Sequence, residues 1–247
     1  MLAPILWWHK YKRKNLQAAS NKPQAASFKQ QALDRTWTVG YYKIMNLKEA
    51  KQITGGLSSP SKMPGYAYNL PAWRCITGVK LQAVEDSVCS GCYAMKGRYR
   101  FRNVKDALSR RLNSLTHPQW VEAMTVLGSH YSQKVPFFRW HDSGDLQGAD
   151  HLKKIFEVCN ATKQVQHWMP TREAKLLTLM DPDVVPKNLI IRVSSHMIDQ
   201  GPVKSWPHTS TVVKAGNTCP ARDQGNECGS CRQCWNKDIN NVAYPLH

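Results

Sequence analysis

Val135-Pro136-Phe137-Phe138-Arg139-Trp140-His141-Asp142-Ser143-Gly144-Asp145 is the stretch that decides the fold of this 247-residue chain. Its first six residues predict a strand, and the last five form a polar end. A helix is predicted at about residues 149–159. Further strands are predicted at 165–169 and 189–193, with a helix at 173–180 between them. The order β-α-β-α-β requires parallel strands joined by right-handed crossovers.

Polar residues follow each of the three predicted strands. His141, Asp142 and Asp145 follow the first strand, Arg172 follows the second, and Ser194 follows the third. The carboxyl ends of parallel strands are the places where α/β proteins assemble their sites. We therefore expect these side chains to share one pocket.

The first strand end supplies the candidate catalytic residues. His141, Asp142 and Asp145 would bind a divalent metal, as in a nuclease, or would orient a substrate. Asp142 has a structural alternative, which is to cap the helix that follows it.

Two arginines and a serine are candidate ligand-binding residues in the same pocket. Arg172 and Arg192 present planar guanidinium groups that suit a carboxylate or a phosphate, and Ser194 lies at the third strand end. The alternative for both arginines is an ion pair with the acidic residues at the neighbouring strand ends.

The remaining sequence predicts further units of the same fold. The expected elements are a strand at 36–42, a helix at 46–53, an ordered loop at 55–73, and helices near 104–115 and 118–132, the last one capped by Thr116. The predicted fold class is α/β, a partial (βα) barrel-like parallel sheet with cysteine-rich segments that bind a metal or a cluster.

The predicted organisation is one domain with an arm. Residues 1–36 are a basic N-terminal arm, either a loose helix or disordered. Residues 37–247 are a single α/β domain, whose C-terminal cysteine-rich segment spans 219–235.

Seven of the eight cysteines fall into two groups that predict metal binding. The groups are Cys75, Cys89 and Cys92, and Cys219, Cys228, Cys231 and Cys234. The last three residues form a C-x2-C-x2-C run, in which two-residue spacers turn successive sulfurs toward one point. Cys159 stands alone at the end of an amphipathic helix and is predicted to pack in the core.

Disulfides are the alternative explanation for so many cysteines. Against them, the sequence shows no secretory signal peptide, and a C-x2-C-x2-C run would pair only close neighbours. No stretch approaches the ~20 apolar residues of a membrane span. We therefore expect a reducing compartment, the cytoplasm of a bacterial or phage-infected host cell.

The identity of the metal rests on the spacing of the cysteines. Pairs of the form C-x2-C are common in zinc sites. Consecutive two-residue spacers are typical of iron–sulfur clusters. The sequence therefore favours one or two [4Fe–4S] clusters, with zinc as the alternative.

The charge predicts a polyanionic partner. The net charge is +17, and residues 93–111 contain seven Lys or Arg against one acid. Lys96, Arg98, Arg100 and Arg102 alternate with Tyr99 and Phe101, a composition that suits phosphates and stacked bases. The alternative for this segment is an edge strand or turn with solvated arginines.

Several motifs resemble those of the phage and plasmid proteins called the gene product 88 family. They are Cys75-Ile76-Thr77-Gly78, Cys89-Ser90-Gly91-Cys92-Tyr93-Ala94, the strand end at 141–145, Pro170-Thr171-Arg172-Glu173 and the terminal cysteine run. The resemblance covers about residues 55–240 and leaves the N-terminal arm outside.

More loosely, the chain is similar to radical SAM enzymes, which have a partial βα barrel and an early cysteine cluster. In those enzymes three cysteines hold a [4Fe–4S] cluster whose fourth iron stays open for S-adenosylmethionine. The resemblance implies this role for Cys75, Cys89 and Cys92. Within the same resemblance, Ser143-Gly144-Asp145 is similar to the Gly-Gly-Glu strand end that binds the methionyl amine of S-adenosylmethionine. The spacing departs from the C-x3-C-x2-C motif, because thirteen residues separate the first two cysteines.

Two hypotheses follow. The first is an iron–sulfur enzyme of radical-SAM-like architecture that acts on nucleic acid. The second is a zinc-stabilised, non-catalytic nucleic-acid-binding protein of phage or mobile-element origin. In either case the four late cysteines hold a metal or cluster of their own, or some of them join Cys89 and Cys92 around one metal.

Overall fold

The computed structural model describes residues 45–178 and 180–246. All of these residues belong to one compact unit, Ile44–His247. The basic arm predicted at 1–36 and the strand predicted at 36–42 both lie outside the described residues.

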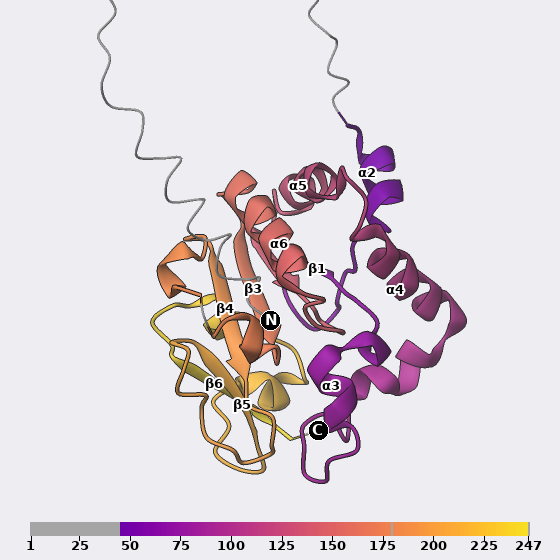
Figure 1. The fold of residues 1–247 in the computed structure, drawn as a ribbon. Helices are drawn as coiled ribbons and strands as arrows, with labels where there is room; N and C mark the ends of the chain where they lie inside the picture. Colours follow the sequence, from indigo (N-terminus) through magenta and orange to yellow (C-terminus); the bar gives the residue numbers. More distant parts are fainter. Residues whose placement is uncertain (1–44, 179, 247) are drawn as a thin grey trace, which may run out of the picture. The chain divides into compact units, whose positions relative to one another are not determined.

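Helices and strands alternate along most of this unit (Figure 1). The α-helices are α2 (Leu47–Thr54), α3 (Ile76–Leu81), α4 (Arg102–Ser114), α5 (Trp120–Tyr131) and α6 (Ala149–Ala161). The strands are β1 (Tyr66–Tyr68), β2 (Phe137–Trp140), β3 (Gln166–Thr171), β4 (Leu189–Ser194), β5 (Thr209–Val213) and β6 (Asn241–Pro245). Short 3-10 helices are η1 (Ala72–Arg74), η2 (Tyr93–Met95), η3 (Gly97–Arg100), η4 (Ala174–Leu176), η5 (Pro182–Val184), η6 (Pro220–Gln224) and η7 (Gln233–Trp235).

The six strands form one sheet in which every neighbouring pair is parallel. Their order in the sheet is β1-β2-β3-β4-β5-β6, the same as their order in the sequence. A parallel sheet without a reversal of strand order winds in one direction, as a (βα) barrel does. The predicted α/β class with a parallel sheet is therefore confirmed. Within the described residues, no helix is both long and apolar enough to span a bilayer.

The three strands and the helix predicted around residues 135–193 are confirmed as β2, α6, β3 and β4. The helix predicted at 173–180 is wrong, because only the single 3-10 turn η4 forms there. Glu173 has a non-helical backbone with ψ near 51°, and its side chain is held by another segment. Asp181 then caps the separate turn η5, which ends any continuation.

The sequence did not reveal β1, β5 and β6. The loop predicted at 55–73 contains β1, which is only three residues long and pairs with β2. The helix predicted at 46–53 is confirmed as α2, with Asn46 as its N-cap. Thr116 does not cap α5, which begins at Trp120 after Gln119.

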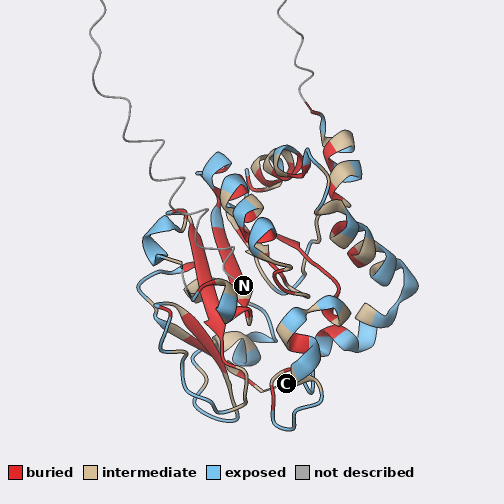
Figure 2. Ribbon diagram, in the orientation of Figure 1, coloured by how far each residue is buried: buried red, intermediate tan, exposed pale blue. Residues whose placement is uncertain are grey.

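One face of the sheet packs on helices. Tyr68, Phe138 and Trp140 point to this face and pack with Trp120 of α5 and with α6 residues such as Ile155. The Tyr68 hydroxyl accepts a hydrogen bond from Trp120 Nε1 at 3.1 Å, and burial raises its pKa to about 12. β4, at the centre of the sheet, is buried along its whole length, as expected when both faces are covered (Figure 2).

Two histidines in this layer predict acid sensitivity. His151 and His167 are buried, and burial lowers the pKa of each from 6.5 to about 3. Below pH 6.5 the unfolded chain binds protons that the folded chain does not, so stability should fall by about 1.4 kcal/mol per pH unit for each histidine, down to about pH 3. Urea midpoints measured between pH 7.5 and 5 should show this slope. His167→Gln should flatten the slope, whereas the exposed control His130→Gln should not.

Candidate metal centres

The three early cysteines lie at the carboxyl edge of the sheet. The chain leaves β1, passes through η1 and reaches Cys75, the residue before α3. The segment before Cys89 is bonded to the turn after β4, where Val88 N donates to His196 O at 2.9 Å. Ser87 and Met197 form an isolated antiparallel bridge beside this bond. Both segments therefore end where the parallel strands end.

The surroundings of Gly78 show how closely the sulfurs of Cys75 and Cys89 approach each other. A Cβ on Gly78 would lie 3.6 Å from the sulfurs of both Cys75 and Cys89, and 2.9 Å from Cys75 Cβ. The thirteen-residue spacer therefore does not keep the two sulfurs apart, because α3 and the following turn fold back on themselves. Only a residue without a side chain fits between them.

Glu173 fastens α3 to the end of β3. Its two carboxylate oxygens accept hydrogen bonds from Thr77 N at 2.7 Å and from Thr77 Oγ1 at 2.8 Å. The Glu173 side chain is buried, and its own backbone N–H donates to Thr171 Oγ1 at 3.0 Å. The contact fixes the position of Cys75, two residues before Thr77.

Asp145 also faces this group of cysteines. Its Oδ1 accepts from Leu146 N at 2.7 Å and Thr171 Oγ1 at 2.6 Å, and its Oδ2 accepts from Arg172 N at 2.8 Å. Burial raises the pKa of this carboxyl to about 6, although the three hydrogen bonds oppose the shift. A carboxyl with this pKa exchanges a proton near neutral pH.

The surroundings of the early cysteines raise the pKa of two of their thiols. Burial raises the pKa of Cys75, and Asp145, Cys92 and Cys89 raise it further. Burial also raises the pKa of Cys89, whereas the Arg172 guanidinium lowers it. The Arg172 Nε is buried without a hydrogen-bond acceptor. The group thus combines thiols that a metal would ionise with a donor that an anion would satisfy.

Gly78→Ala should disrupt this group. The new methyl carbon would meet Cys75 Cβ at 2.9 Å, a contact that requires α3 or Cys75 to move. We expect the variant to lose metal from the early cysteines, measured as metal per chain after purification. Gly128→Ala in α5 is the matched control, because its nearest contact is an ordinary 3.6 Å from Thr162. Equal metal content in both variants would mean that the approach at Gly78 is unimportant for binding.

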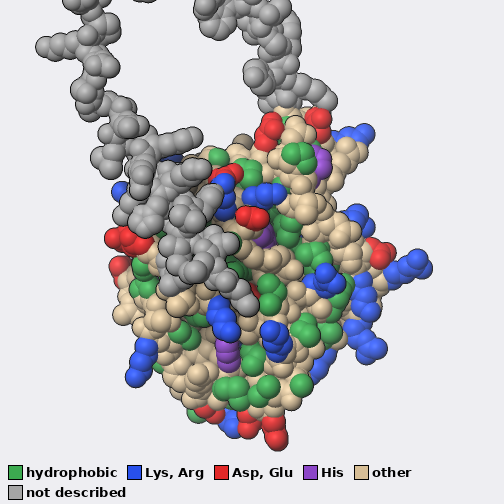
Figure 3. Space-filling view, viewed as in Figure 1, with side chains coloured by type: hydrophobic (Ala, Val, Ile, Leu, Met, Phe, Trp, Pro, Cys, Tyr) green, Lys and Arg blue, Asp and Glu red, His purple; other side chains and the backbone are tan. Residues whose placement is uncertain are grey.

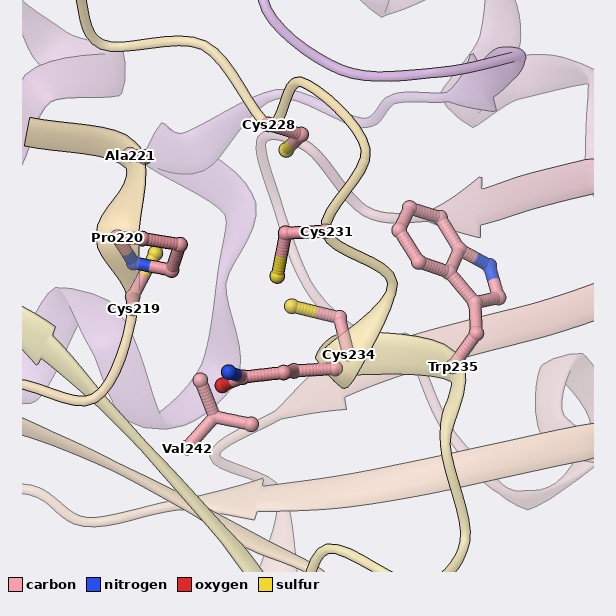
Figure 4. Close-up of a pocket in the computed structure, with 9 residues that line it drawn as sticks. Cys219, Pro220, Ala221, Cys228, Cys231, Cys234, Trp235 and Val242 are labelled. Atoms are coloured by element: carbon pink, nitrogen blue, oxygen red, sulfur yellow. The ribbon is translucent and has the colours of Figure 1, made fainter. Parts of the chain in front are cut away.

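The four late cysteines line a cavity of their own. Figure 4 shows the side chains of Cys219, Cys228, Cys231 and Cys234 around one small space, with Trp235 and Val242 beside them. The cavity measures about 20 Å³, and none of the early cysteines lines it. Burial raises the pKa of Cys219 and Cys228, and it raises that of Cys234 to about 11.

This cysteine-rich segment covers the second face of the sheet. Trp235 donates from Nε1 to Phe138 O at 3.1 Å, and its ring packs edge-on against Trp168 of β3 with centroids 5.1 Å apart. Arg139 of β2 lies over the Trp168 ring at 4.5 Å. Cys234 Sγ lies 3.1 Å from the Tyr244 hydroxyl of β6. The segment is therefore part of the fold and not an appended tail.

Arg192 holds the same segment in place, which corrects its predicted role in ligand binding. The side chain is fully buried on β4. Its guanidinium donates to backbone carbonyls of Thr209, Gln233, Cys234, Asn236, Ile239 and Asn240, at 2.9 to 3.4 Å. No donor remains for a bound anion or for the acidic strand ends, so both sequence-based alternatives for Arg192 are wrong.

His141 and Asp142 also differ from their predicted roles. His141 is 2% exposed, and its ring packs on His151 of α6 with centroids 5.4 Å apart. Asp142 accepts from Arg139 Nη1 at 2.9 Å and from the Tyr99 hydroxyl at 2.9 Å. Gly148, not Asp142, precedes the first turn of α6. Asp142 thus joins the end of β2 to η3, which leaves Asp145 as the carboxylate that faces the cysteines.

Three further predicted ligand-binding residues have packing roles. Ser143 Oγ donates to Leu70 O at 2.9 Å, and a Cβ on Gly144 would come within 2.6 Å of Leu70. Gly144 also has a positive φ of 76°, which glycine adopts without strain. Ser194 Oγ bonds to Ser210 Oγ at 2.9 Å between β4 and β5. These residues position the strand ends instead of presenting polar groups to a ligand.

All eight cysteines are free thiols in the described chain. Cys159 is fully buried in the helix-facing core, as predicted. Within residues 45–178 and 180–246, no three Cys, His, Asp or Glu side chains are arranged so that they could hold one metal ion. The donor types nevertheless fit a soft metal or an iron–sulfur cluster, since four thiols surround one cavity and three gather at the sheet edge.

Sequence reasoning missed Thr77, Gly78 and the anchoring role of Glu173. Thr77 and Gly78 lie inside the Cys75-Ile76-Thr77-Gly78 motif, so their position next to a cysteine was the available signal. The basic segment forms the 3-10 turns η2 and η3 with exposed Arg98 and Arg100, so a turn is present there and not an edge strand.

A family model described as "Gene product 88" matches residues 41–237. No curated protein and no solved structure matches the chain.

Proposed function

The chain belongs to the gene product 88 family, and we propose that it is an iron–sulfur protein whose three early cysteines form the reactive site. The observation behind this proposal is the separation of seven cysteines into a group of three and a group of four. Cys75, Cys89 and Cys92 gather beside Asp145 and Arg172 at the carboxyl edge of the sheet.

The number of cysteines suggests different roles for the two groups. A metal or cluster bound by three protein thiolates keeps one coordination position for a substrate or cofactor, whereas four thiolates close the site. The four late cysteines lie in a segment that packs on the sheet through Trp235 and Arg192, which suits a second cluster with a structural role. The three early cysteines lie where α/β sheets assemble reactive sites.

In this proposal, Cys75, Cys89 and Cys92 hold a [4Fe–4S] cluster, and S-adenosylmethionine is the candidate ligand for the open iron. Such a cluster supplies one electron at a time to its ligand. Arg172 would offer its buried, unpaired Nε to an anionic group of the cluster or ligand. Asp145, with a pKa raised by burial to about 6, would hold or release a proton beside it. The features that this proposal shares with radical SAM enzymes are a parallel βα sheet and three cysteines that hold a cluster with one open iron.

The proposed substrate is a nucleic acid, because the net charge is +17 and basic residues are dense just after Cys92. Free thiols persist in a reducing compartment, and all eight cysteines are free, so we place the protein in the cytoplasm of a bacterial or phage-infected cell.

A second candidate function is a zinc-stabilised, non-catalytic nucleic-acid-binding protein. The cavity between the late cysteines favours it, since about 20 Å³ is the space of roughly one water-sized guest. Four thiolates around one ion are the usual ligand set of a structural zinc site.

Metal analysis of the full chain purified without oxygen separates the two candidates. The iron–sulfur proposal predicts a brown protein with iron and acid-labile sulfide in equal amounts. A colourless protein with stoichiometric zinc and no sulfide would overturn it and support the second candidate. Tight binding of S-adenosylmethionine in equilibrium dialysis, lost when iron is removed, would support the proposed ligand, and absence of binding would refute that part.

A further inference from the structure

A second cavity lies next to the early cysteines, on the side of α4. Its volume is about 430 Å³, within the ~300–1,000 Å³ typical of small-molecule sites. The lining residues are Trp73, Ala94, Met95, Tyr99, Arg100 and Lys105. Aromatic, thioether and basic side chains therefore surround one space.

The walls of this cavity continue into the three-cysteine group. Trp73 lies two residues before Cys75, and Ala94 and Met95 follow Cys92 in η2. The Met95 N–H donates to Cys92 O, so this wall is bonded directly to a cysteine, and the Cys75 N–H donates to Ala72 O, the residue before Trp73. A molecule in the cavity would lie beside the early cysteines.

One aromatic wall is fixed in place. The Tyr99 hydroxyl donates to Asp142 Oδ2 at 2.9 Å, and Asp142 is held in turn by Arg139 at 2.9 Å. The Tyr99 ring also packs edge-on against Tyr93, with centroids 5.9 Å apart. An aromatic ring held in this way loses little entropy when a flat ligand stacks on it.

The surroundings of the cavity are strongly basic. Arg100 and Lys105 belong to its lining, and Lys96, Arg98 and Arg102 lie close by in the sequence and are exposed. In Figure 3, Lys and Arg side chains gather along the edge of the molecule where α4 runs in Figure 1. Phosphates on either side of a base in the cavity would meet these cations.

We propose that this cavity binds one base of a single-stranded nucleic acid, stacked between Trp73 and Tyr99, with the flanking phosphates on Arg100 and Lys105. A duplex does not fit this description, because its bases are stacked on one another and cannot enter a cavity. The proposal rests on the proposed function only for the chemistry that would follow binding. Binding itself requires no cluster, so the two can fail separately.

Fluorescence anisotropy with labelled oligonucleotides tests the proposal on the full chain, purified without oxygen. We expect single strands to bind more tightly than duplexes of the same length, with separate RNA and DNA titrations to identify the sugar. Trp73→Leu should weaken binding by about 10- to 100-fold, the loss of one stacked base. Tyr131→Leu, at an aromatic residue of α5 outside the cavity lining, is the matched control and should change binding little.

A salt titration tests the phosphate contacts. Arg100→Gln and Lys105→Gln should each lower the slope of log affinity against log salt by about 0.7, the value for one phosphate of a single strand. These two side chains are not part of the cysteine segments, so they remain informative if Trp73→Leu disturbs the metal content. The proposal is overturned if duplexes or anionic vesicles bind as tightly as single strands, or if Trp73, Arg100 and Lys105 can all be replaced without effect. Metal content measured on the same samples shows separately whether the iron–sulfur proposal holds.

Discussion

Replacing Cys75 by Ser should remove the iron and sulfide of the early site and leave those of the late site in place. Cys75 is one of three thiols at this edge, close to Gly78 and under the influence of Asp145, so its loss leaves only two thiolate ligands there. Cys231→Ser should have the opposite effect, because Cys231 lines only the late cavity. Iron and sulfide per chain in each variant provide the measurement.

Cys159→Ser is the control for these variants, because Cys159 lies in the helix-facing core. It should keep the metal content of the unmodified chain, with at most a moderate loss of stability from the buried hydroxyl. If Cys75→Ser and Cys231→Ser both remove all iron, the seven cysteines share one centre, and the separation into two sites is wrong.

Arg192→Met should be among the most destabilising substitutions in the chain. It would take these donors away from the buried carbonyl of Thr209 and from part-buried carbonyls such as those of Gln233 and Cys234. Each unsatisfied buried acceptor costs about 1–3 kcal/mol, so we expect a loss of at least about 3 kcal/mol in the free energy of unfolding. The late cysteines should also lose their metal, because Cys234 would no longer be positioned.

The exposed Arg110→Met in α4 is the matched control, and it should change stability by less than about 0.5 kcal/mol. Denaturant unfolding followed by far-UV circular dichroism measures both effects. An Arg192→Met variant as stable as the Arg110→Met variant would mean that the cysteine-rich segment does not depend on β4 for its position.

The central strands were predictable from sequence because their signals are local. β3 and β4 each have six residues, contain a central apolar run such as Leu189-Ile190-Ile191, and end in a polar residue, and helix α6 precedes β3. β1 was not predictable, since three residues give no period to recognise. The spacing of Cys228, Cys231 and Cys234 is likewise local, because two-residue turns bring such side chains together. The close approach of Cys75 to Cys89 is not encoded by their spacing in the sequence. It depends on Gly78 and on the contact between Thr77 and Glu173.

The candidate site was predictable only in part, because the sequence shows which residues end a strand but not which way their side chains point. Asp145 was identified from its position at a strand end, and it does lie beside the early cysteines. Arg192 has the same kind of position, but its side chain points to the face where a segment about forty residues later docks. The residues next to Arg192 in the sequence do not indicate that this later segment docks on its face of the sheet. Long-range packing therefore decides which polar residues at a strand end face a site.

The early and late cysteines are proposed to bind two separate iron–sulfur clusters. Native mass spectrometry of the full chain, reconstituted with iron and sulfide without oxygen, is the decisive measurement because it weighs the intact cofactors. We expect a chain with the mass of two [4Fe–4S] cores, and a chain with one core for Cys75→Ser. An unmodified chain that takes up one core, only zinc ions, or no cluster at all would overturn the proposal.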